Sequence, residues 1–494
     1  MCLKKCAVSY VIWAIMLLCL LPLMWFWGME AAQLYMNGNA LAAIGVIIGF
    51  GGILFLLYYL SWLLLKRIKP RKRRFLIGFK VRITETILVA TFLLTAILIR
   101  DYCMSAMVED MTYYNLAKVG SQEGVRYTFV QGSVYYYCAL LHGMFRVFGN
   151  HFEVGIWLQI ILQALAGLFM YLAVRRLSGR ACAMLVLLYI CFSKTSMDEG
   201  LRYSPNMLFL CLFSLGFWVC ADYIRRSEND EENPVFMWIY TIVTGVVSGF
   251  LCYVDISGLI LLLLLICLLW VKRGIGKTAL WFLRYVVIVI SAVIVFLVFM
   301  VVDGMLSGTS FTGVFNAWFF TYGSLKVDFS ALTSKGQPDF FWLPALSCVG
   351  VFTFWRRIRH DVFSPYVLMT VGLMILYFLG ITSESMDGTY LLFVVMMGLA
   401  SVSVTELFHR NANMYYKPKA EVANSDVAFE SYDEKMEMTD LEKKEITTQN
   451  EQMIENPLPG PKKRERKVMD YAFEPQGIQM VYDIRVSDKD DFDI

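Results

Sequence analysis

Two acidic pairs, Glu109–Asp110 and Asp198–Glu199, are the residues of this chain best suited to group-transfer chemistry. A carboxylate can act as a general base and take the proton of an acceptor hydroxyl. Basic side chains can neutralise a departing phosphate, and each acidic pair has such neighbours along the sequence. These neighbours are Lys118, Arg126, Lys194 and Arg202. The acidic pairs also have a structural alternative, because Asp and Glu cap the N-termini of helices.

Two further carboxylates, Asp101 and Asp255, are weaker candidates for the same kind of site. Asp101 directly follows Arg100, so the alternative for it is a simple ion pair with that neighbour. Asp255 stands between two apolar segments, where a turn residue is the alternative. The histidines have no metal-ligand spacing; they are His142, His151, His360 and His409.

The composition shows what kind of elements must position these residues. Of the 494 residues, 58% are apolar and 17% are charged, and the mean hydropathy is +0.57. Apolar segments of about 17–25 residues, the length that crosses a hydrocarbon layer, recur over roughly the first 410 positions. This pattern excludes a soluble multidomain enzyme and predicts an all-α polytopic membrane protein.

We expect about twelve transmembrane helices. Ser204-Pro205 favours a helix start, since proline suits the first helical position. The expected spans are 7–27, 40–65, 82–100, 154–174, 181–196, 204–224, 235–253, 256–271, 279–303, 340–354, 364–381 and 389–408.

The charges between these spans predict the orientation. Basic residues fill every second loop, and the alternating loops carry far fewer of them. The positive-inside rule therefore places the basic loops, and with them both chain termini, in the cytoplasm. The basic loops contain Lys66–Arg74, Arg175–Arg180, Arg225–Arg226, Lys272–Lys277 and Arg356–Arg359.

Two long loops, 101–153 and 303–339, are then expected on the outer face. Residues 133–148 are aromatic and amphipathic and end at Gly149-Asn150, which predicts an interfacial helix with its tyrosines at headgroup level. The alternative is a thirteenth span, which would invert the predicted orientation of every later span and loop. The aromatic run Phe315–Tyr322 is a candidate acceptor cleft or, alternatively, part of an interfacial belt.

The chain divides into three regions by composition. Residues 1–75 hold two extra spans and a basic loop, 76–410 form the core, and 411–494 are charged and poor in aliphatic residues. The last region cannot bury enough apolar area to order itself, so we expect a disordered cytoplasmic tail. Its proline-rich piece Asn456–Pro461 suits the docking of a cytoplasmic protein, and a passive solvated tail is the alternative. Nothing predicts a nucleic-acid partner.

Residues 83–225 resemble the start of the GT-C superfamily of membrane glycosyltransferases, such as protein O-mannosyltransferases and the aminoarabinose transferase. The shared pattern is an acidic pair ahead of tyrosine (Glu109–Tyr114), a tyrosine-rich helix that ends in glycine (Tyr135–Gly149) and the phrase Arg175-Arg176-Leu177-Ser178-Gly179-Arg180. The chain departs from the family at Gln131–Val134, where a Pro-Pro pair is usual, and at Pro205-Asn206, where an acidic residue is usual.

The resemblance implies catalysis on the outer face with a polyprenyl-phosphate sugar as donor and inversion at the sugar. Asp110 would be the base, assisted by Glu109, and Arg126 and Arg202 would hold the phosphate. Further substrate contacts would come from Tyr113, Lys118, Asp198 and Glu199, with Asp101 and Asp255 as additional candidates. A divalent cation, Mg²⁺ or Mn²⁺, bridging Asp110 and Asp198 is an optional part of this site.

Three other functions fit parts of the pattern. A polysaccharide polymerase or ligase also works on the outer face with a polyprenyl-linked glycan. A secondary transporter also has twelve spans, but it normally carries ionisable residues at mid-membrane, where this chain has almost none. A non-enzymatic scaffold would only display the tail. A bacterial plasma membrane is the expected location, ahead of the endoplasmic reticulum.

Overall fold

A computed structural model describes eight long segments of the chain and several short pieces. The long segments are 40–67, 82–104, 111–123, 132–227, 234–271, 278–323, 360–379 and 389–415. The short pieces are 14–15, 18, 25, 28–29, 32–33, 339, 342–344 and 346–347. Glu109, Asp110 and Arg126 lie outside the described residues, as do most of the predicted spans 7–27 and 340–354 and the region after Tyr415.

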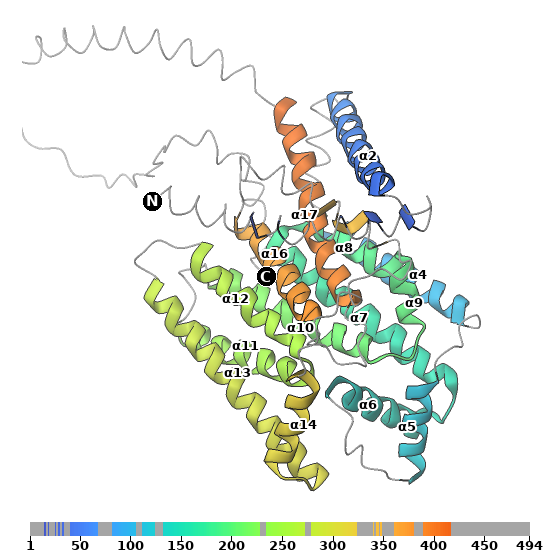
Figure 1. The fold of residues 1–494 in the computed structure, drawn as a ribbon, viewed down its shortest axis with the longest axis vertical. Coiled ribbons are helices and arrows are strands. Elements are labelled where there is room, and N and C mark those ends of the chain that lie inside the picture. Colours follow the sequence, from blue (N-terminus) through green and yellow to red (C-terminus); the bar gives the residue numbers. More distant parts are fainter. Residues whose placement is uncertain are drawn as a thin grey trace, which may run out of the picture. The chain divides into compact units, whose positions relative to one another are not determined.

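The described residues form helices joined by short connections, with no strand among them (Figure 1). The helices are α2 (Ala40–Arg67), α4 (Arg82–Cys103), α5 (Thr112–Glu123), α6 (Gly132–Phe148), α7 (Phe152–Ser178), α8 (Arg180–Phe192), α9 (Lys194–Gly200), α10 (Pro205–Arg226), α11 (Pro234–Val254), η2 (Ile256–Gly258), α12 (Leu259–Val271), α13 (Thr278–Ser307), α14 (Phe311–Gly323), α16 (His360–Phe378) and α17 (Thr389–Tyr415).

The expectation of an all-α membrane protein is confirmed. Within the described segments, five helices are long and apolar enough to cross a membrane, and the bent pair α8–α9 makes a sixth if it counts as one span. The five stretches are Thr84–Cys103, Phe152–Ser178, Pro205–Arg226, Pro234–Val254 and Leu280–Met305. The total of twelve spans, the sidedness of the loops and the three composition regions stay predictions. The structure itself separates a unit of residues 1–408 from one of residues 409–494, of which 409–415 are described.

Several helix ends fall where the local sequence predicts them. Ser204 caps α10, because its Oγ accepts the backbone N–H of Asn206 at 3.1 Å, and Pro205 occupies the first helical position. Gly149 ends α6 in the left-handed region, with φ +88°, which glycine adopts without a steric penalty.

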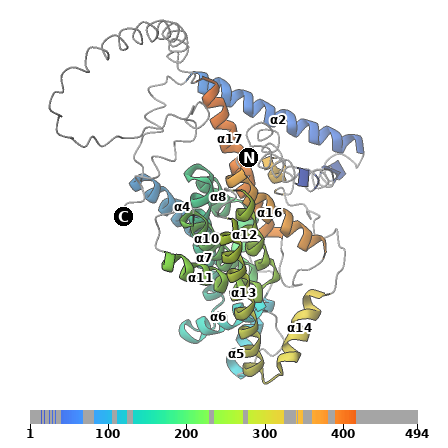
Figure 2. The same cartoon turned by 90° about the vertical axis from the view of Figure 1, so that its left-hand side faces the viewer.

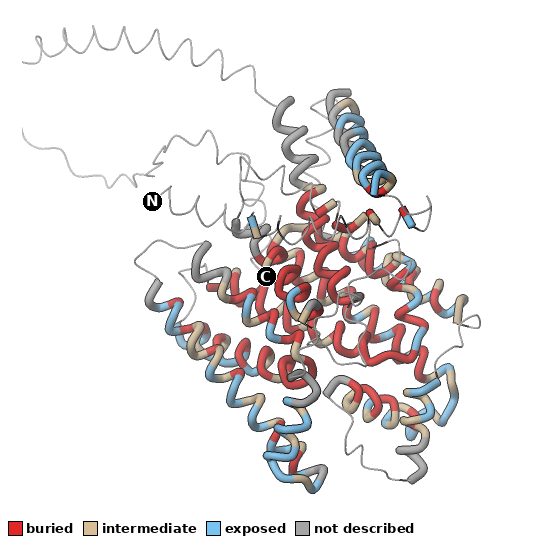
Figure 3. The backbone as a smooth tube through the Cα atoms, viewed as in Figure 1, coloured by how far each residue is buried: buried red, intermediate tan, exposed pale blue. Residues whose placement is uncertain are grey.

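The core lies around α7 and α10, which pack together along most of their length, with α8 against the other side of α7. In Figure 3 these helices and the coloured parts of α16 and α17 are mostly buried, whereas α13 exposes one long face. Large aromatic side chains fill the core; the fully buried ones include Phe209, Phe213, Phe217, Tyr366 and Phe393. The exposed face of α13 consists of apolar residues, as a lipid-facing surface would.

Glycines allow α11 and α13 to approach closely. A Cβ added to Gly245 would stand 2.6 Å from the carbonyl oxygen of Ile288, and one on Gly249 would stand 2.3 Å from that of Ala292. The two glycines are four residues apart and therefore lie on one face of α11. Small residues at this spacing bring helix backbones together, which increases van der Waals contact between them.

Two buried carboxylates join the helix ends that the sequence places on the cytoplasmic side. Glu85 of α4 pairs with Arg175 at 2.8 Å and with Arg180 at 3.1 Å. Asp222 of α10 pairs with Arg176 at 3.3 Å and with Arg226 at 2.7 Å. Part of the basic pattern that predicts the orientation thus also ties α4, α7, α8 and α10 together.

The opposite helix ends carry α5, α6 and α14, as Figure 1 and the turned view of Figure 2 both show. The predicted helix over 133–148 is confirmed as α6, which packs on α5, α7, α10 and α11. This end also holds the connection between α8 and α9 and the start of α10. The candidate site therefore lies at this end.

Candidate functional site

The predicted span 181–196 is wrong in one respect, because the helix breaks at Ser193. α8 ends at Phe192, α9 begins at Lys194, and their axes differ by 56°. Ser193 is extended, with φ −68° and ψ 145°, and its side chain accepts the backbone N–H of Ser196 at 3.2 Å. This N-cap starts a new helix and so terminates the old one. The break turns the residues of α9, including Asp198 and Glu199, away from the axis of α8.

Arg100 of α4 reaches into this break. Its guanidinium donates to the carbonyl oxygens of Cys191 at 2.9 Å and Ile190 at 3.1 Å, both in the last turn of α8. A third bond goes to the carbonyl of Ala96 at 3.1 Å, and Arg100 as a whole is only 2% exposed. The alternative that Arg100 simply pairs with Asp101 is therefore wrong, and Asp101 itself is exposed.

A chain of neutral hydrogen bonds holds α9 from the other side. Gln163 of α7 donates from Nε2 to both the carbonyl oxygen and the Oγ of Ser196, each at 2.6 Å. Ser196 Oγ also lies 2.7 Å from the hydroxyl of Tyr390 in α17. Because all three side chains are buried, these bonds fix α9 against α7 and α17 in a setting without competing water.

The structure separates the two members of the second acidic pair. Glu199 is 6% exposed and accepts a hydrogen bond from Asn206 Nδ2 at 3.2 Å. Asp198 is exposed, and so is Arg202 just after α9. Adjacent helical residues point about 100° apart, so one member of such a pair can face the core while the other faces outward. Asp198 and Arg202 are thus accessible to a ligand, and Glu199 supports the fold beneath them.

Asp339 is a buried carboxylate that the sequence prediction missed, since it appears there only as the end of a loop. It accepts hydrogen bonds from Tyr189 Oη at 2.8 Å and Trp342 Nε1 at 2.8 Å, and also from Thr195 Oγ1. Asp339 thus anchors the first turn of α9 from a third direction. The only available signal was the tryptophan three residues after the aspartate, which is too common a pattern to identify a buried site.

Tyr114 connects the first acidic cluster to the second. It lies in α5, four residues after Asp110, and its ring packs edge-on against Tyr203 with 5.7 Å between centroids. Tyr203 lies four residues after Glu199. The Tyr114 hydroxyl also donates to the carbonyl oxygen of Asn150 at 2.9 Å, which holds α5 at the start of α7. Tyr114 and Tyr203, each of which follows one of the two acidic pairs in the sequence, are therefore in contact.

The remaining predicted residues have separate places. Tyr113 packs edge-on against Tyr137, at 6.1 Å between centroids, and Lys118 lies over the ring of Tyr114 at 5.9 Å. Asp255 is 1% exposed, and its Oδ1 accepts the backbone N–H of Ser257 at 2.8 Å. It caps η2, as the turn alternative predicts.

A second polar group at this end combines Asp303 with tyrosines. The hydroxyl of Tyr253 donates to the Asp303 carboxylate, and the ring of Tyr136 lies edge-on to that of Tyr253 at 6.5 Å between centroids. Burial, followed by the nearby Asp303 carboxylate, raises the pKa of Tyr136 above its ordinary value. The Tyr136 hydroxyl is therefore a hydrogen-bond donor at every physiological pH.

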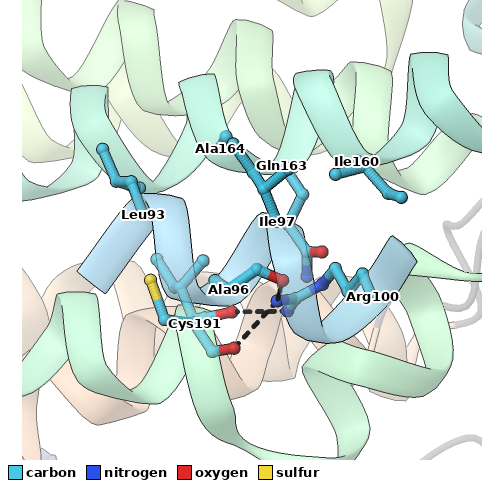
Figure 4. Close-up of a pocket in the computed structure, with 9 residues that line it drawn as sticks. Leu93, Ala96, Ile97, Arg100, Ile160, Gln163, Ala164 and Cys191 are labelled. Atoms are coloured by element: carbon cyan, nitrogen blue, oxygen red, sulfur yellow. Dashed lines mark hydrogen bonds between the residues drawn. The ribbon is translucent and has the colours of Figure 1, made fainter. Parts of the chain in front are cut away.

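A narrow cleft runs from the α8–α9 break between α4, α7 and α8 (Figure 4). Its cavity volume, about 10 Å³, is close to what one water molecule needs. Arg100 and Gln163 form its polar part. The rest is apolar and is lined by Leu93, Ala96, Ile97, Ile160, Ala164, Ile190 and Cys191.

The described part of the chain brings together no three His, Cys, Asp or Glu side chains that could hold a metal ion. The Mg²⁺ or Mn²⁺ site suggested for Asp110 and Asp198 stays a prediction, because Asp110 lies outside the described residues.

Comparison with known proteins gives structural matches only. No protein-family model and no curated protein matches the chain. The crystal structure of ArnT from Cupriavidus metallidurans bound to undecaprenyl phosphate is similar with a TM-score of 0.47 and 14% identity, over 69% of this chain and 63% of that one.

Two crystal structures of the Archaeoglobus fulgidus oligosaccharyltransferase are also similar. The structure tethered with an acceptor peptide has a TM-score of 0.42 and 13% identity, over 64% of this chain and 49% of that one. The complex with Zn and sulfate has a TM-score of 0.41 and 12% identity, over 65% and 50%. The neighbours are GT-C glycosyltransferases, the superfamily that the sequence resembles. At such identities and TM-scores they carry no information on the activity of this chain.

Proposed function

We propose that this chain is a multi-pass membrane glycosyltransferase that moves a sugar from a polyprenyl-phosphate donor to an acceptor hydroxyl on the outer face of a bacterial plasma membrane. The acceptor belongs to a protein, a lipid or a glycan of the cell envelope. The reaction inverts the configuration of the sugar.

The observation that carries this proposal is the contact between Tyr114 and Tyr203. It joins the segment after Glu109–Asp110 to the segment after Asp198–Glu199, although the two lie about ninety residues apart in sequence. Asp110 is four positions before Tyr114, and fully extended chain spans at most ~3.6 Å per residue, so the Cα atoms of these two residues can be at most ~14 Å apart. This supports our proposal that the two acidic pairs act in one site.

Each residue then has a role that its chemistry allows. Asp110 takes the proton of the acceptor hydroxyl, and Glu109 assists it. The acceptor oxygen attacks the anomeric carbon, the bond from that carbon to the phosphate oxygen breaks, and the bond electrons leave with the polyprenyl phosphate. Arg202, which is exposed, and Arg126 neutralise the leaving phosphate.

The other candidates act around this centre. Asp198 is exposed, four positions before the exposed Arg202, and suits contacts with sugar hydroxyls or with a divalent cation. Lys118 adds positive charge on α5, and Tyr113 provides an aromatic face beside α6. Glu199 is buried and holds Asn206 at the start of α10, so we assign it a supporting role.

A lipid-carried donor fits the kind of surface that the helices offer. The exposed side chains of α4 and α13 are largely apolar; they include Leu94, Leu98, Ile290, Val293, Ile294 and Leu297. A polyprenyl chain can approach the outer end along such surfaces without leaving hydrocarbon. The reactive phosphate then needs only cations at the headgroup level.

Replacing Asp110 with Asn tests the proposal. The purified protein is placed in liposomes with radiolabelled polyprenyl-phosphate sugars and an extract of envelope acceptors, and labelled product is counted. Removing a general base lowers such rates by about 10²- to 10⁴-fold, and we expect a loss in this range for Asp110→Asn.

The matched control is Glu153→Gln, which removes an exposed carboxylate from the first turn of α7 and should transfer sugar at the wild-type rate. Arg202→Gln should raise the KM for the donor. Transfer by Asp110→Asn at the wild-type rate would refute the assignment of the base.

A further inference from the structure

The break between α8 and α9 creates a need for hydrogen-bond donors. The last carbonyl groups of a helix have no partner within that helix. Two nearby backbone bonds are made at this break, from Ser193 N–H to Tyr189 O and from Met197 N–H to Ser193 O, both at 2.9 Å. The carbonyls of Ile190 and Cys191 lie between them and point into the protein, where an unsatisfied carbonyl is costly. Ser196 Oγ of α9 donates to Ile190 O at 2.5 Å.

Arg100 donates to both carbonyls from a different helix, and at Ile190 O its bond adds to the one from Ser196. One guanidinium nitrogen binds Cys191 O and the other binds Ile190 O, so the planar group spans two successive carbonyls. Its positive charge also lies at the negative end of the α8 dipole. Figure 4 shows this side chain passing from α4 to the end of α8.

We propose that Arg100 is a positioning residue that sets the angle of the α8–α9 break and thereby places Asp198, Glu199 and Arg202 for sugar transfer. This inference rests on the proposed function, because it assigns Arg100 a part in the same site. Nothing in the sequence pattern indicated Arg100, which appeared there only as a neighbour of Asp101.

Burial supports a specific role for this cation. Arg100 is 2% exposed, and no carboxylate among the described residues forms an ion pair with it. Glu199 and Arg100 both lie close enough to the Tyr390 hydroxyl to act on it electrostatically. Burying an arginine against backbone carbonyls is expensive unless its hydrogen bonds are well made, and here they define one geometry of the break.

Gly200, the last residue of α9, completes the contact. A Cβ added there would stand 2.1 Å from Gln163 Oε1 and 3.0 Å from Arg100 Nε. Arg100 therefore contacts both sides of the break, the end of α8 through its terminal nitrogens and the end of α9 through Nε. Gln163 Oε1 and Arg100 Nε, both buried, have no hydrogen-bond partner among the residues that the structure describes. They face the residue directly after Glu199, so a movement of Arg100 moves that carboxylate.

Hydrogen–deuterium exchange of the full-length protein in nanodiscs tests this without relying on activity. Arg100→Lys keeps the charge but loses the planar fork that binds two carbonyls. We expect the amides of residues 194–201 to exchange about 10- to 100-fold faster, the change expected for losing a hydrogen bond to a charged group. The amides of α11 and α13 should be unchanged. Arg146→Lys, at an exposed arginine in the last turn of α6, is the matched control. It should leave the exchange of residues 194–201 and of α11 and α13 unchanged.

Kinetics give the second readout. Arg100→Lys should lower kcat for sugar transfer about tenfold or more and leave the KM for the donor within about twofold. Gly200→Ala places a methyl group against the same contact with Arg100 intact, and it should reproduce both effects.

Each outcome has one meaning. Unchanged exchange at 194–201 in both Arg100→Lys and Gly200→Ala overturns the positioning role, and so does faster exchange with a wild-type kcat. The wild-type protein could transfer no sugar while the amides of residues 194–201 still exchange faster in Arg100→Lys and Gly200→Ala. In that case the proposed function fails, and the structural part of the inference stands.

Discussion

Asp339 accepts hydrogen bonds from Tyr189, Thr195 and Trp342, and it is 4% exposed. Asp339→Ala would take this acceptor from three donors, of which Tyr189 and Thr195 are buried and Trp342 is partly buried. Each unsatisfied buried group costs about 1–3 kcal/mol, so we expect at least ~2 kcal/mol of lost stability, seen as a lower Tm of the purified protein.

Asp339→Asn keeps one acceptor oxygen, so its Tm should fall less than that of Asp339→Ala. A Tm of Asp339→Ala equal to that of the wild type would show that this carboxylate does not anchor α9.

At the level of single residues, the sequence predicted which side chains to consider but not their directions. Asp198 and Glu199 form one acidic pair in sequence, yet only packing decides that Glu199 faces Asn206 and Asp198 faces outward. Arg100 and Asp339 could not be identified, because their partners lie about 90 and 150 residues away along the chain. Such long-range pairs have no local pattern.

Helix contacts make a separate prediction at α11 and α13. Gly249→Ala should lower the Tm, because the added carbon would stand 2.3 Å from a backbone oxygen of α13 and the helices would have to separate. Overpacking of this kind costs about 1–3 kcal/mol.

Gly143→Ala in α6 is the matched control. A Cβ there meets nothing within 4 Å, so the better helix propensity of alanine should raise stability by up to about 1 kcal/mol. Equal shifts of the Tm in Gly249→Ala and Gly143→Ala would contradict the close contact between α11 and α13.

The helices themselves were predictable where the signals are local. Hydropathy predicted α7, α10, α11 and α13 to within about four residues at each end, and Ser204-Pro205 predicted the start of α10. The break at Ser193 was missed, since the apolar pattern runs through it and a serine alone does not end a helix. What fixes the break is a cap at Ser193 together with Arg100 from another helix, and the second part is tertiary structure.

For the whole molecule, the basic loops predict that the region after residue 410 lies in the cytoplasm. A protease added to sealed inside-out vesicles should remove this region, and the same protease outside intact cells should not. Cleavage in intact cells would invert the topology and place the candidate site on the cytoplasmic side.

Deleting residues 416–494 makes a second prediction at this scale. The deleted region follows the last described residue of α17 and contains none of the candidate site residues, so sugar transfer in liposomes should remain within about twofold of the full-length rate. The deletion should abolish only the docking of a cytoplasmic partner.

The source of the transferred sugar is the central claim for the molecule. The described residues form helices and their connections, and several of the helices are long and apolar enough to cross a membrane. The proposed function therefore takes its donor from the lipid phase rather than from a nucleotide. The direct measurement gives purified protein in liposomes the same labelled sugar as either a polyprenyl phosphate or a nucleotide diphosphate, with envelope acceptors present. We expect labelled product and free polyprenyl phosphate from the first donor alone, and product from the nucleotide donor, or from neither, would contradict this account.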